Sequence, residues 1–159
     1  MIAVSDTSPI CYLILIGEIE LLPKLFGQIQ ITPAVLAELL HEAAPPMVRQ
    51  WATNLPSWIA VKAVPFMSIA GLEKLQTGEQ SGILLAECSL SGVILLDEKA
   101  ARRIATNRGL QVTGILGVLE EAATEGLIDL AQVIDRLRTT NFRSSPSLLK
   151  SVLDRHGNR

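Results

Sequence analysis

Residues 93–97 read Val-Ile-Leu-Leu-Asp, and this run decides the fold. Four uninterrupted apolar residues predict a strand buried on both faces, which is typical of parallel sheets. A helical pattern precedes the run over about 77–91, with capping-box spacing from Thr77 to Gln80, and another follows over 98–107. Met1–Ser5 is a similar apolar run that ends at Asp6. Strands that alternate with helices predict an α/β fold.

The remaining pattern extends this alternation along the whole chain. Thr32-Pro33 is a helix start signal, and Ser145 can cap the last helix. Further strands are expected at 28–31, 58–61 and 111–113, and further helices at 9–17, 19–25, 33–41, 48–52, about 68–76, 114–126, 130–139 and 146–156. We therefore predict a three-layer α/β/α domain with a mostly parallel central sheet of four to five strands. No repeat or linker interrupts it, so residues 1–159 are expected to form one domain, with the C-terminal helices of about 130–156 packed on it.

Composition narrows the class of protein. Of the 159 residues, 48% are apolar and 19% charged, which excludes intrinsic disorder. The apolar excess favours a self-associating surface, so we expect a homodimer. Two cysteines, Cys11 and Cys88, exclude a disulfide scaffold and a thiolate zinc site, and they indicate a reducing, cytoplasmic location. The sequence has no 18-residue uncharged apolar run, so we expect no membrane span.

The two parts of the chain carry opposite net charge. Residues 1–98 hold four basic and ten acidic side chains, a net charge of 4 − 10 = −6. Residues 99–159 hold ten basic and six acidic ones, a net charge of 10 − 6 = +4. Such a split is typical of a protein with two surfaces for different partners, although random scatter gives the same sums.

The two clearest strands end in the same residue type, Asp6 and Asp97. Functional groups of open α/β sheets gather outside the carboxyl ends of the strands. A carboxylate there is costly to bury unless it is paired, protonated or bound to a metal. The alternative is helix capping, with Asp97 at the start of 98–107 and Asp6 satisfying the turn at Thr7–Pro9.

Several enzyme classes lack their motifs in this sequence. Thr7-Ser8 follows Asp6, so the Asp-x-Asp of a dehalogenase-type phosphatase is missing, and a receiver domain would need an acidic pair there. Phosphate loops, dinucleotide fingerprints and HExxH are also absent, and His41 and His156 stand far apart. An all-carboxylate site for Mg²⁺ or Mn²⁺ remains, since these hard ions prefer oxygen ligands.

The order of motifs resembles the PIN-domain nucleases. The matching segments are Asp6-Thr7-Ser8-Pro9, Thr32-Pro33 with Val35 and Glu38, Thr77-Gly78-Glu79 with Ala86, Leu95-Leu96-Asp97-Glu98 with Arg102, and Gly114-Ile115-Leu116-Gly117-Val118-Leu119, the last typical of a prokaryotic PIN branch. The resemblance covers essentially the whole chain. It implies an acidic pocket of Asp6, Glu38, Glu79 and Asp97 that binds Mg²⁺ or Mn²⁺. Many relatives have two aspartates where this chain has Asp97-Glu98, which leaves the role of Glu98 open.

The residues alone leave parts of this site undecided. Glu38 lies off the apolar face of its helix, but Glu42 lies on the same side, and only the resemblance selects Glu38. Glu79 stands in a first helical turn, where the helix dipole favours an acid in any case. Gly114 and Gly117 are expected to let a helix approach the sheet. The aromatic content of 4% gives no recognisable platform for stacking bases.

The resemblance implies a metal-dependent endoribonuclease that cleaves single-stranded RNA, commonly the toxin of a toxin–antitoxin pair related to virulence-associated toxins. Thr7 or Ser8 would orient the first carboxylate or a metal-bound water, and we expect Arg102 and Arg103 to contact phosphates. We also expect a small antitoxin that docks along an apolar groove and places a basic side chain among the four acids. The alternative is a catalytically inactive PIN-like module that binds nucleic acid.

Overall fold

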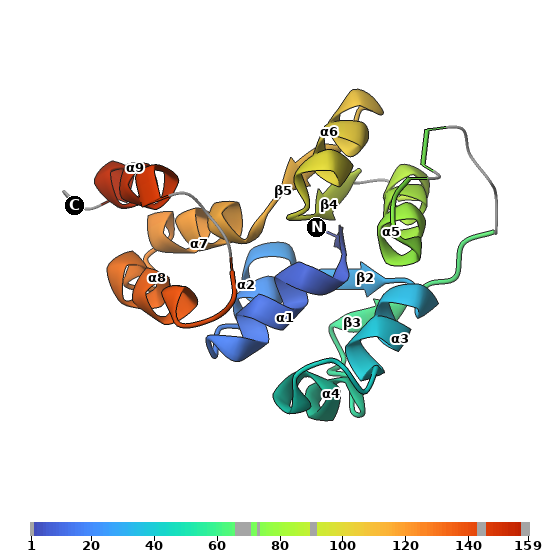
Figure 1. Cartoon of the computed structure of the whole chain (residues 1–159), viewed down its shortest axis with the longest axis horizontal. Helices are drawn as coiled ribbons and strands as arrows, with labels where there is room; N and C mark the ends of the chain where they lie inside the picture. Colours follow the sequence, from blue (N-terminus) through green and yellow to red (C-terminus); the bar gives the residue numbers. More distant parts are fainter. Residues whose placement is uncertain (1, 66–70, 73, 90–91, 143–145, 157–159) are drawn as a thin grey trace.

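The computed structural model describes residues 2–65, 71–72, 74–89, 92–142 and 146–156 (Figure 1). Within them one sheet of five parallel strands runs in the order β3-β2-β1-β4-β5. The strands are β1 (Ile2–Ser5), β2 (Gln28–Ile31), β3 (Ile59–Val61), β4 (Val93–Leu95) and β5 (Gln111–Thr113). The predicted α/β fold with its parallel sheet is confirmed.

The order in which the chain adds strands to the sheet reverses between β1 and β4, which makes this point a topological switch point. The chain first adds β2 and β3 on one side of β1, and then crosses over to add β4 and β5 on the other. β1 and β4 pair with Ser5 opposite Leu95, and the Asp6 N–H donates to the Leu95 carbonyl oxygen at 3.0 Å. Ligands of open α/β sheets bind at the carboxyl ends of the strands at this kind of reversal. Asp6 follows β1 and Asp97 follows β4, so the two aspartates lie at the ends of the two strands on either side of this reversal.

Nine helices in the described residues cover both faces of the sheet. They are α1 (Thr7–Leu15), α2 (Leu21–Phe26), α3 (Pro33–Leu40), α4 (Pro46–Ala52), α5 (Thr77–Cys88), α6 (Lys99–Asn107), α7 (Ile115–Thr124), α8 (Leu130–Arg138) and α9 (Pro146–His156). Ala3 and Leu95 join the core cluster under α1–α4 and α7. Val4 and Ile94, which point to the opposite face, join the core cluster under α5 and α6. This is the expected three-layer arrangement.

Most predicted boundaries hold to within a few residues, and two differ for physical reasons. α1 begins at Thr7 rather than Pro9, because a proline in the first turn loses no intrahelical hydrogen bond. The cap of α5 is Gln76, one residue before the predicted Thr77. The helix expected around 68–76 is wrong where it can be compared, because residues 71–72 and 74–75 form turns and a bend; residues 68–70 and 73, like Ser145, lie outside the described residues.

The C-terminal helices share the core under α7. Buried side chains of α8 and α9, among them Ile134 and Val152, belong to the same cluster as Ala3 of β1. Figure 1 shows α8 and α9 beside α7, at the far end of the molecule from α5. None of the helices in the described part of the chain is long and apolar enough to span a bilayer.

Candidate active site

Asp6 lies at the junction of β1 and α1 and is only 5% exposed. It occupies the N-cap position of α1 without a side-chain capping hydrogen bond, and the Thr7 backbone N–H acts on its carboxyl, so the expected alternative of a cap at this turn accounts for part of its surroundings. Its Oδ1 is buried without a hydrogen-bond partner in the described structure. The pKa of Asp6 is raised to about 7, mainly by burial; the Thr7 backbone N–H lowers this pKa, and the nearby carboxylates of Glu79, Glu38 and Asp97 contribute to raising it. A buried acid with an unused oxygen is ready to bind a cation.

Asp97 follows β4 and is fixed by a different helix from the one it precedes. Its Oδ1 accepts a hydrogen bond from the Ile115 N–H at 2.8 Å, in the first turn of α7. The N-cap of α6 is Glu98, so the predicted alternative that Asp97 caps the helix directly after it is wrong. The Oδ2 of Asp97 is buried and has no hydrogen-bond partner among the described residues. Burial raises the pKa of Asp97, while the Ile115 N–H and the Arg102 guanidinium lower it.

Glu38 reaches the site from α3. Thr32 caps this helix through a buried hydroxyl that accepts from the Val35 N–H at 3.2 Å. The Thr7 hydroxyl donates a hydrogen bond to Glu38 Oε2, which ties α3 to the start of α1. Glu42, which the sequence pattern allowed equally, lies exposed beyond the end of α3. The structure therefore separates these two acids.

Glu79 stands in the first turn of α5 and is 8% exposed. Its Oε1 accepts from the Gln76 N–H at 3.1 Å. Burial raises the pKa of Glu79, with smaller raising contributions from the nearby carboxylates of Glu98 and Glu38 and a lowering one from the Gln76 N–H. Glu79 thus takes part in the capping box of its own helix and also contributes a carboxylate to the acidic site.

Two glycines make room for two of these carboxylates. A Cβ at Gly78 would lie 2.9 Å from Glu38 Cδ, and one at Gly114 would lie 2.7 Å from Asp97 Oδ1 and 3.0 Å from Arg102 Nη1. Real Cβ atoms essentially never approach other atoms so closely. We expected Gly114 to serve helix–sheet packing. Instead it admits a carboxylate and a guanidinium.

The supporting residues take partly different places from those predicted. Thr7 orients Glu38 rather than Asp6, and Ser8 lines a pocket together with Asp97. Glu98 is exposed and lies near Glu79. Arg102 stands beside Asp97, whereas Arg103 is an exposed residue on the same helix, outside the residues that line this pocket.

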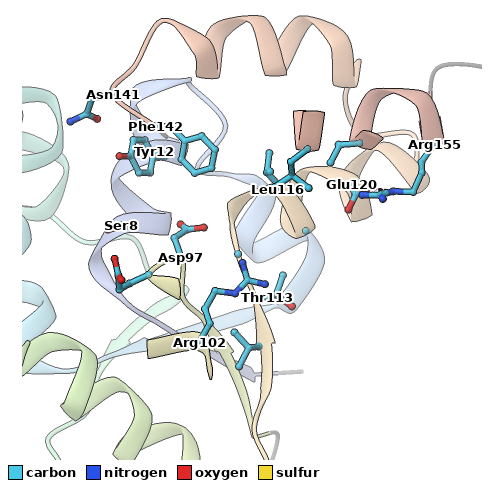
Figure 2. Close-up of a pocket in the computed structure, with 16 residues that line it drawn as sticks. Ser8, Tyr12, Asp97, Arg102, Thr113, Leu116, Glu120, Asn141, Phe142 and Arg155 are labelled. Carbon is cyan, nitrogen blue, oxygen red and sulfur yellow. Dashed lines mark hydrogen bonds and ion pairs between the residues drawn. The ribbon is translucent and has the colours of Figure 1, made fainter. Parts of the chain in front are cut away.

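The pocket beside Asp97 has a volume of about 640 Å³ and is shown in Figure 2. Besides residues of the predicted motifs it is lined by Tyr12, Phe142 and Arg155. These three side chains were not predicted from the sequence. Tyr12 lies one helical turn after Ser8, and that spacing could have indicated it. Phe142 and Arg155 carry no local signal, because only the packing of the C-terminal segment brings them here.

The donor set fits a hard divalent cation. It consists of carboxylate oxygens, which Mg²⁺ and Mn²⁺ prefer, and one oxygen each of Asp6 and Asp97 is buried without a partner in the described structure. Among the described residues, however, no three His, Cys, Asp or Glu side chains stand together in an arrangement that could hold one ion. Side chains must therefore rotate for three of them to bind the same ion.

Comparison with known proteins shows a family to which the chain is similar. A family model described as a PIN domain matches residues 2–158, nearly the full length. Neither the curated proteins nor the solved structures include a match to this chain. The matched span holds all four acids and every element of the sheet. The chain belongs to the PIN-domain family.

Proposed function

We propose that this protein is a metal-dependent endoribonuclease that cleaves single-stranded RNA. PIN domains are generally nucleases and typically use divalent metal ions. The single observation that carries the proposal is the position of Asp6, which is near enough to the carboxylates of Glu38, Glu79 and Asp97 for their charges to act on it, while Asp6 and Asp97 each keep a buried oxygen without a partner in the described structure.

The chain's own residues prepare this site for phosphodiester chemistry. A bound Mg²⁺ or Mn²⁺ supplies a water of lowered pKa and neutralises charge on the phosphate. Asp6 and Asp97 would hold the ion, since each keeps one oxygen unused. Thr7 and the Gln76 N–H fix Glu38 and Glu79, which could complete the ligand set. Arg102 offers a cation beside Asp97 for a phosphate of the substrate.

The Glu38/Glu42 pair provides a sharp test. Glu38→Gln keeps the shape of a side chain that contacts Thr7, whereas Glu42→Gln changes an exposed acid just beyond the same helix. We expect the wild type and Glu42→Gln to cleave a labelled single-stranded RNA with Mn²⁺ or Mg²⁺, leaving 5′-phosphate ends, and Glu38→Gln to lose at least about 100-fold in rate.

Other outcomes of this assay contradict the proposal. Equal rates for both variants would remove Glu38 from the site. An intact substrate under all metal conditions, with RNA still bound, would favour the alternative of an inactive PIN-like module that binds nucleic acid.

We further propose that the enzyme is the toxin of a toxin–antitoxin pair, restrained by a small partner protein. A second pocket, of about 450 Å³, runs from Thr7 and Glu38 to the segment after α3, and includes Cys11, His41 and Pro45. Its apolar lining with an acid at one end would suit a partner helix that presents an arginine or lysine. Co-expression with the adjacent gene should give a complex without nuclease activity. A fully active complex, or none, would contradict this.

A homodimer is part of the same proposal. Leu40 and Met47, near the ends of α3 and α4, are 42% and 56% exposed. Burial of such residues between two copies would remove apolar surface from water. Light scattering at micromolar concentration should give twice the mass of the chain, and a monomeric mass would refute the dimer.

A further inference from the structure

The pocket beside Asp97 is built from several parts of the chain that are distant in sequence. α1 contributes Tyr12, the segment after β4 contributes Asp97 and Glu98, and α7 contributes Leu116 and Glu120. The C-terminal segment contributes Asn141, Phe142 and Arg155. The volume of about 640 Å³ lies within the range of roughly 300–1,000 Å³ that ligand pockets occupy.

One side of this pocket is aromatic. The rings of Tyr12 and Phe142 meet edge to face, with centroids 5.2 Å apart and planes at 81°. The Thr140 hydroxyl accepts from the Phe142 N–H at 3.1 Å and so fixes the backbone that presents the ring. Both side chains are half-buried and line the pocket, as Figure 2 shows. Trp51 and Trp58, the two largest aromatic residues, instead pack against each other and the core.

Another side of the pocket holds an arginine in a fixed position. Glu120 Oε1 accepts from Arg155 Nε at 2.8 Å and lies 2.6 Å from Arg155 Nη2. The Arg155 side chain is still 56% exposed, so its Nη1 edge can take a second anion. Figure 2 shows the Glu120–Arg155 pair beyond Leu116, away from Arg102 and Asp97. The pocket therefore has cations at two places, and one acid of the metal site, Asp97, also lines it.

We infer that this pocket binds one nucleotide of the RNA strand adjacent to the cleaved bond, with the base against Phe142 and a phosphate on Arg155. This inference rests on the proposed ribonuclease function and adds a positioning site to it. The flat base of a nucleotide matches the aromatic side of the pocket, and its anionic phosphate matches the arginine. The bond to be cleaved would then lie at the end of the pocket where Asp97 stands. A protein partner would need no such combination of a ring, a guanidinium and a metal site.

Binding measured in EDTA tests this inference without any cleavage. The probe is a short labelled single-stranded RNA, titrated at several salt concentrations with wild type, Arg155→Gln, Phe142→Leu and Arg138→Gln. Arg138 is the matched control, because it is an exposed arginine on α8 that also pairs with one acid, Asp135, but lies outside the residues that line the pocket. Thermal melts establish that each variant is folded.

The two pocket variants should weaken binding in different ways. Arg155→Gln should lower the affinity and reduce the slope of log K against log salt by about 0.7, the value for one phosphate contact on a single strand. Phe142→Leu should lower the affinity about 5-fold or more with the slope unchanged, since stacking is not ionic. On the same sugar–phosphate chain without bases, Phe142→Leu should bind like the wild type.

Several results would overturn the inference. If both pocket variants bind the RNA with the same affinity as Arg138→Gln, or if the wild type binds no RNA, the inference is wrong. Failure of the proposed function looks different: the wild type would bind RNA with this pattern of variants but would not cleave it when Mn²⁺ is added.

Discussion

Asp6 is the residue whose environment differs most from that of a free side chain. Its pKa is raised from 3.8 to about 7 by burial and by the neighbouring carboxylates. Between these two values the folded chain keeps a proton on Asp6 that the unfolded chain has released. The free energy of unfolding therefore falls as the pH rises through this range, by up to about 4 kcal/mol from Asp6 alone.

We predict that Asp6→Asn flattens this pH dependence in metal-free buffer. Asparagine keeps the shape but cannot ionise, so the variant should be more stable than the wild type near pH 8, and the difference should disappear below about pH 4. Thermal unfolding in EDTA across this range measures the effect. Parallel pH profiles of the two proteins would show that the Asp6 carboxyl is not perturbed in this way.

Gly114 provides a second test at the scale of one residue. Gly114→Ala places a methyl group on the Asp97 carboxylate and the Arg102 guanidinium, and displacement by a fraction of an ångström should lower the cleavage rate about 10- to 100-fold. Gly82→Ala is the matched control, because its Cβ would meet Ile94 Cδ1 at an ordinary 3.6 Å inside α5. That variant should retain activity and gain up to about 1 kcal/mol of stability. Equal activity of the two variants would contradict the steric role of Gly114.

The acids at the strand ends were predictable from sequence, and their surroundings were not. Asp6 and Asp97 follow buried apolar runs, which is a local signal. Glu38 needed family resemblance, because Glu42 fits the helical pattern equally well. The bond from Asp97 to the start of α7 spans two elements, so no local pattern could indicate it. Contacts of this kind, between residues that are distant in the sequence, distinguish a site residue from a helix cap.

At the scale of elements, the start of α3 connects two acid-bearing helices. The buried Thr32 hydroxyl caps α3 and also lies 2.7 Å from the Ser81 hydroxyl of α5. Glu38 and Glu79 stand on these same two helices. The cap therefore contributes to the relative position of the acids as well as to helix stability.

We predict that Thr32→Ala lowers the free energy of unfolding by about 2 kcal/mol, since it removes a buried cap and leaves the Val35 N–H unsatisfied. Asp129→Ala removes the exposed cap of α8, which accepts from the Gln132 N–H at 3.3 Å, and should cost about 0.5–1 kcal/mol. Urea denaturation compares the two. If Thr32→Ala lowers the free energy of unfolding less than Asp129→Ala does, the contact between the start of α3 and α5 is not important for stability.

Element order was readable because each strand and helix has its own periodicity and start signal. Thr32-Pro33 and the run 93–96 are examples, and both elements begin within one residue of the predicted position. The beginnings of α1 and α5 were shifted, because proline tolerance and the Gln76–Glu79 contact depend on the backbone around them. What sequence periodicity could not supply is the packing of α9 against α7, which completes the pocket.

At the scale of the whole molecule, the charge split along the chain acquires a spatial meaning at Arg102. This residue belongs to the basic part of the chain, yet it stands beside Asp97 of the acidic part. Other arginines are already paired on the surface, such as Arg108 with Glu87 at 2.8 Å. The summed charges alone could not have distinguished these two situations.

We predict that Arg102→Gln weakens RNA binding and lowers the salt slope by about 0.7, whereas Arg108→Gln changes neither. Arg108 is the control because it lies on the C-terminal side of the same helix and is held by Glu87. Fluorescence anisotropy at several salt concentrations measures both quantities. If Arg102→Gln keeps the slope of the wild type, phosphate neutralisation by this residue is wrong.

The central claim is that the acids at the reversal of the sheet bind a divalent metal and cleave RNA. The most direct measurement is the single-turnover cleavage of single-stranded RNA over a Mn²⁺ titration, with wild type and Asp97→Asn compared in parallel. The account predicts saturable, metal-dependent cleavage by the wild type and a loss of at least about 100-fold in Asp97→Asn, with the fold intact in thermal melts. Undiminished cleavage by Asp97→Asn, or wild-type cleavage that persists in EDTA, would contradict it.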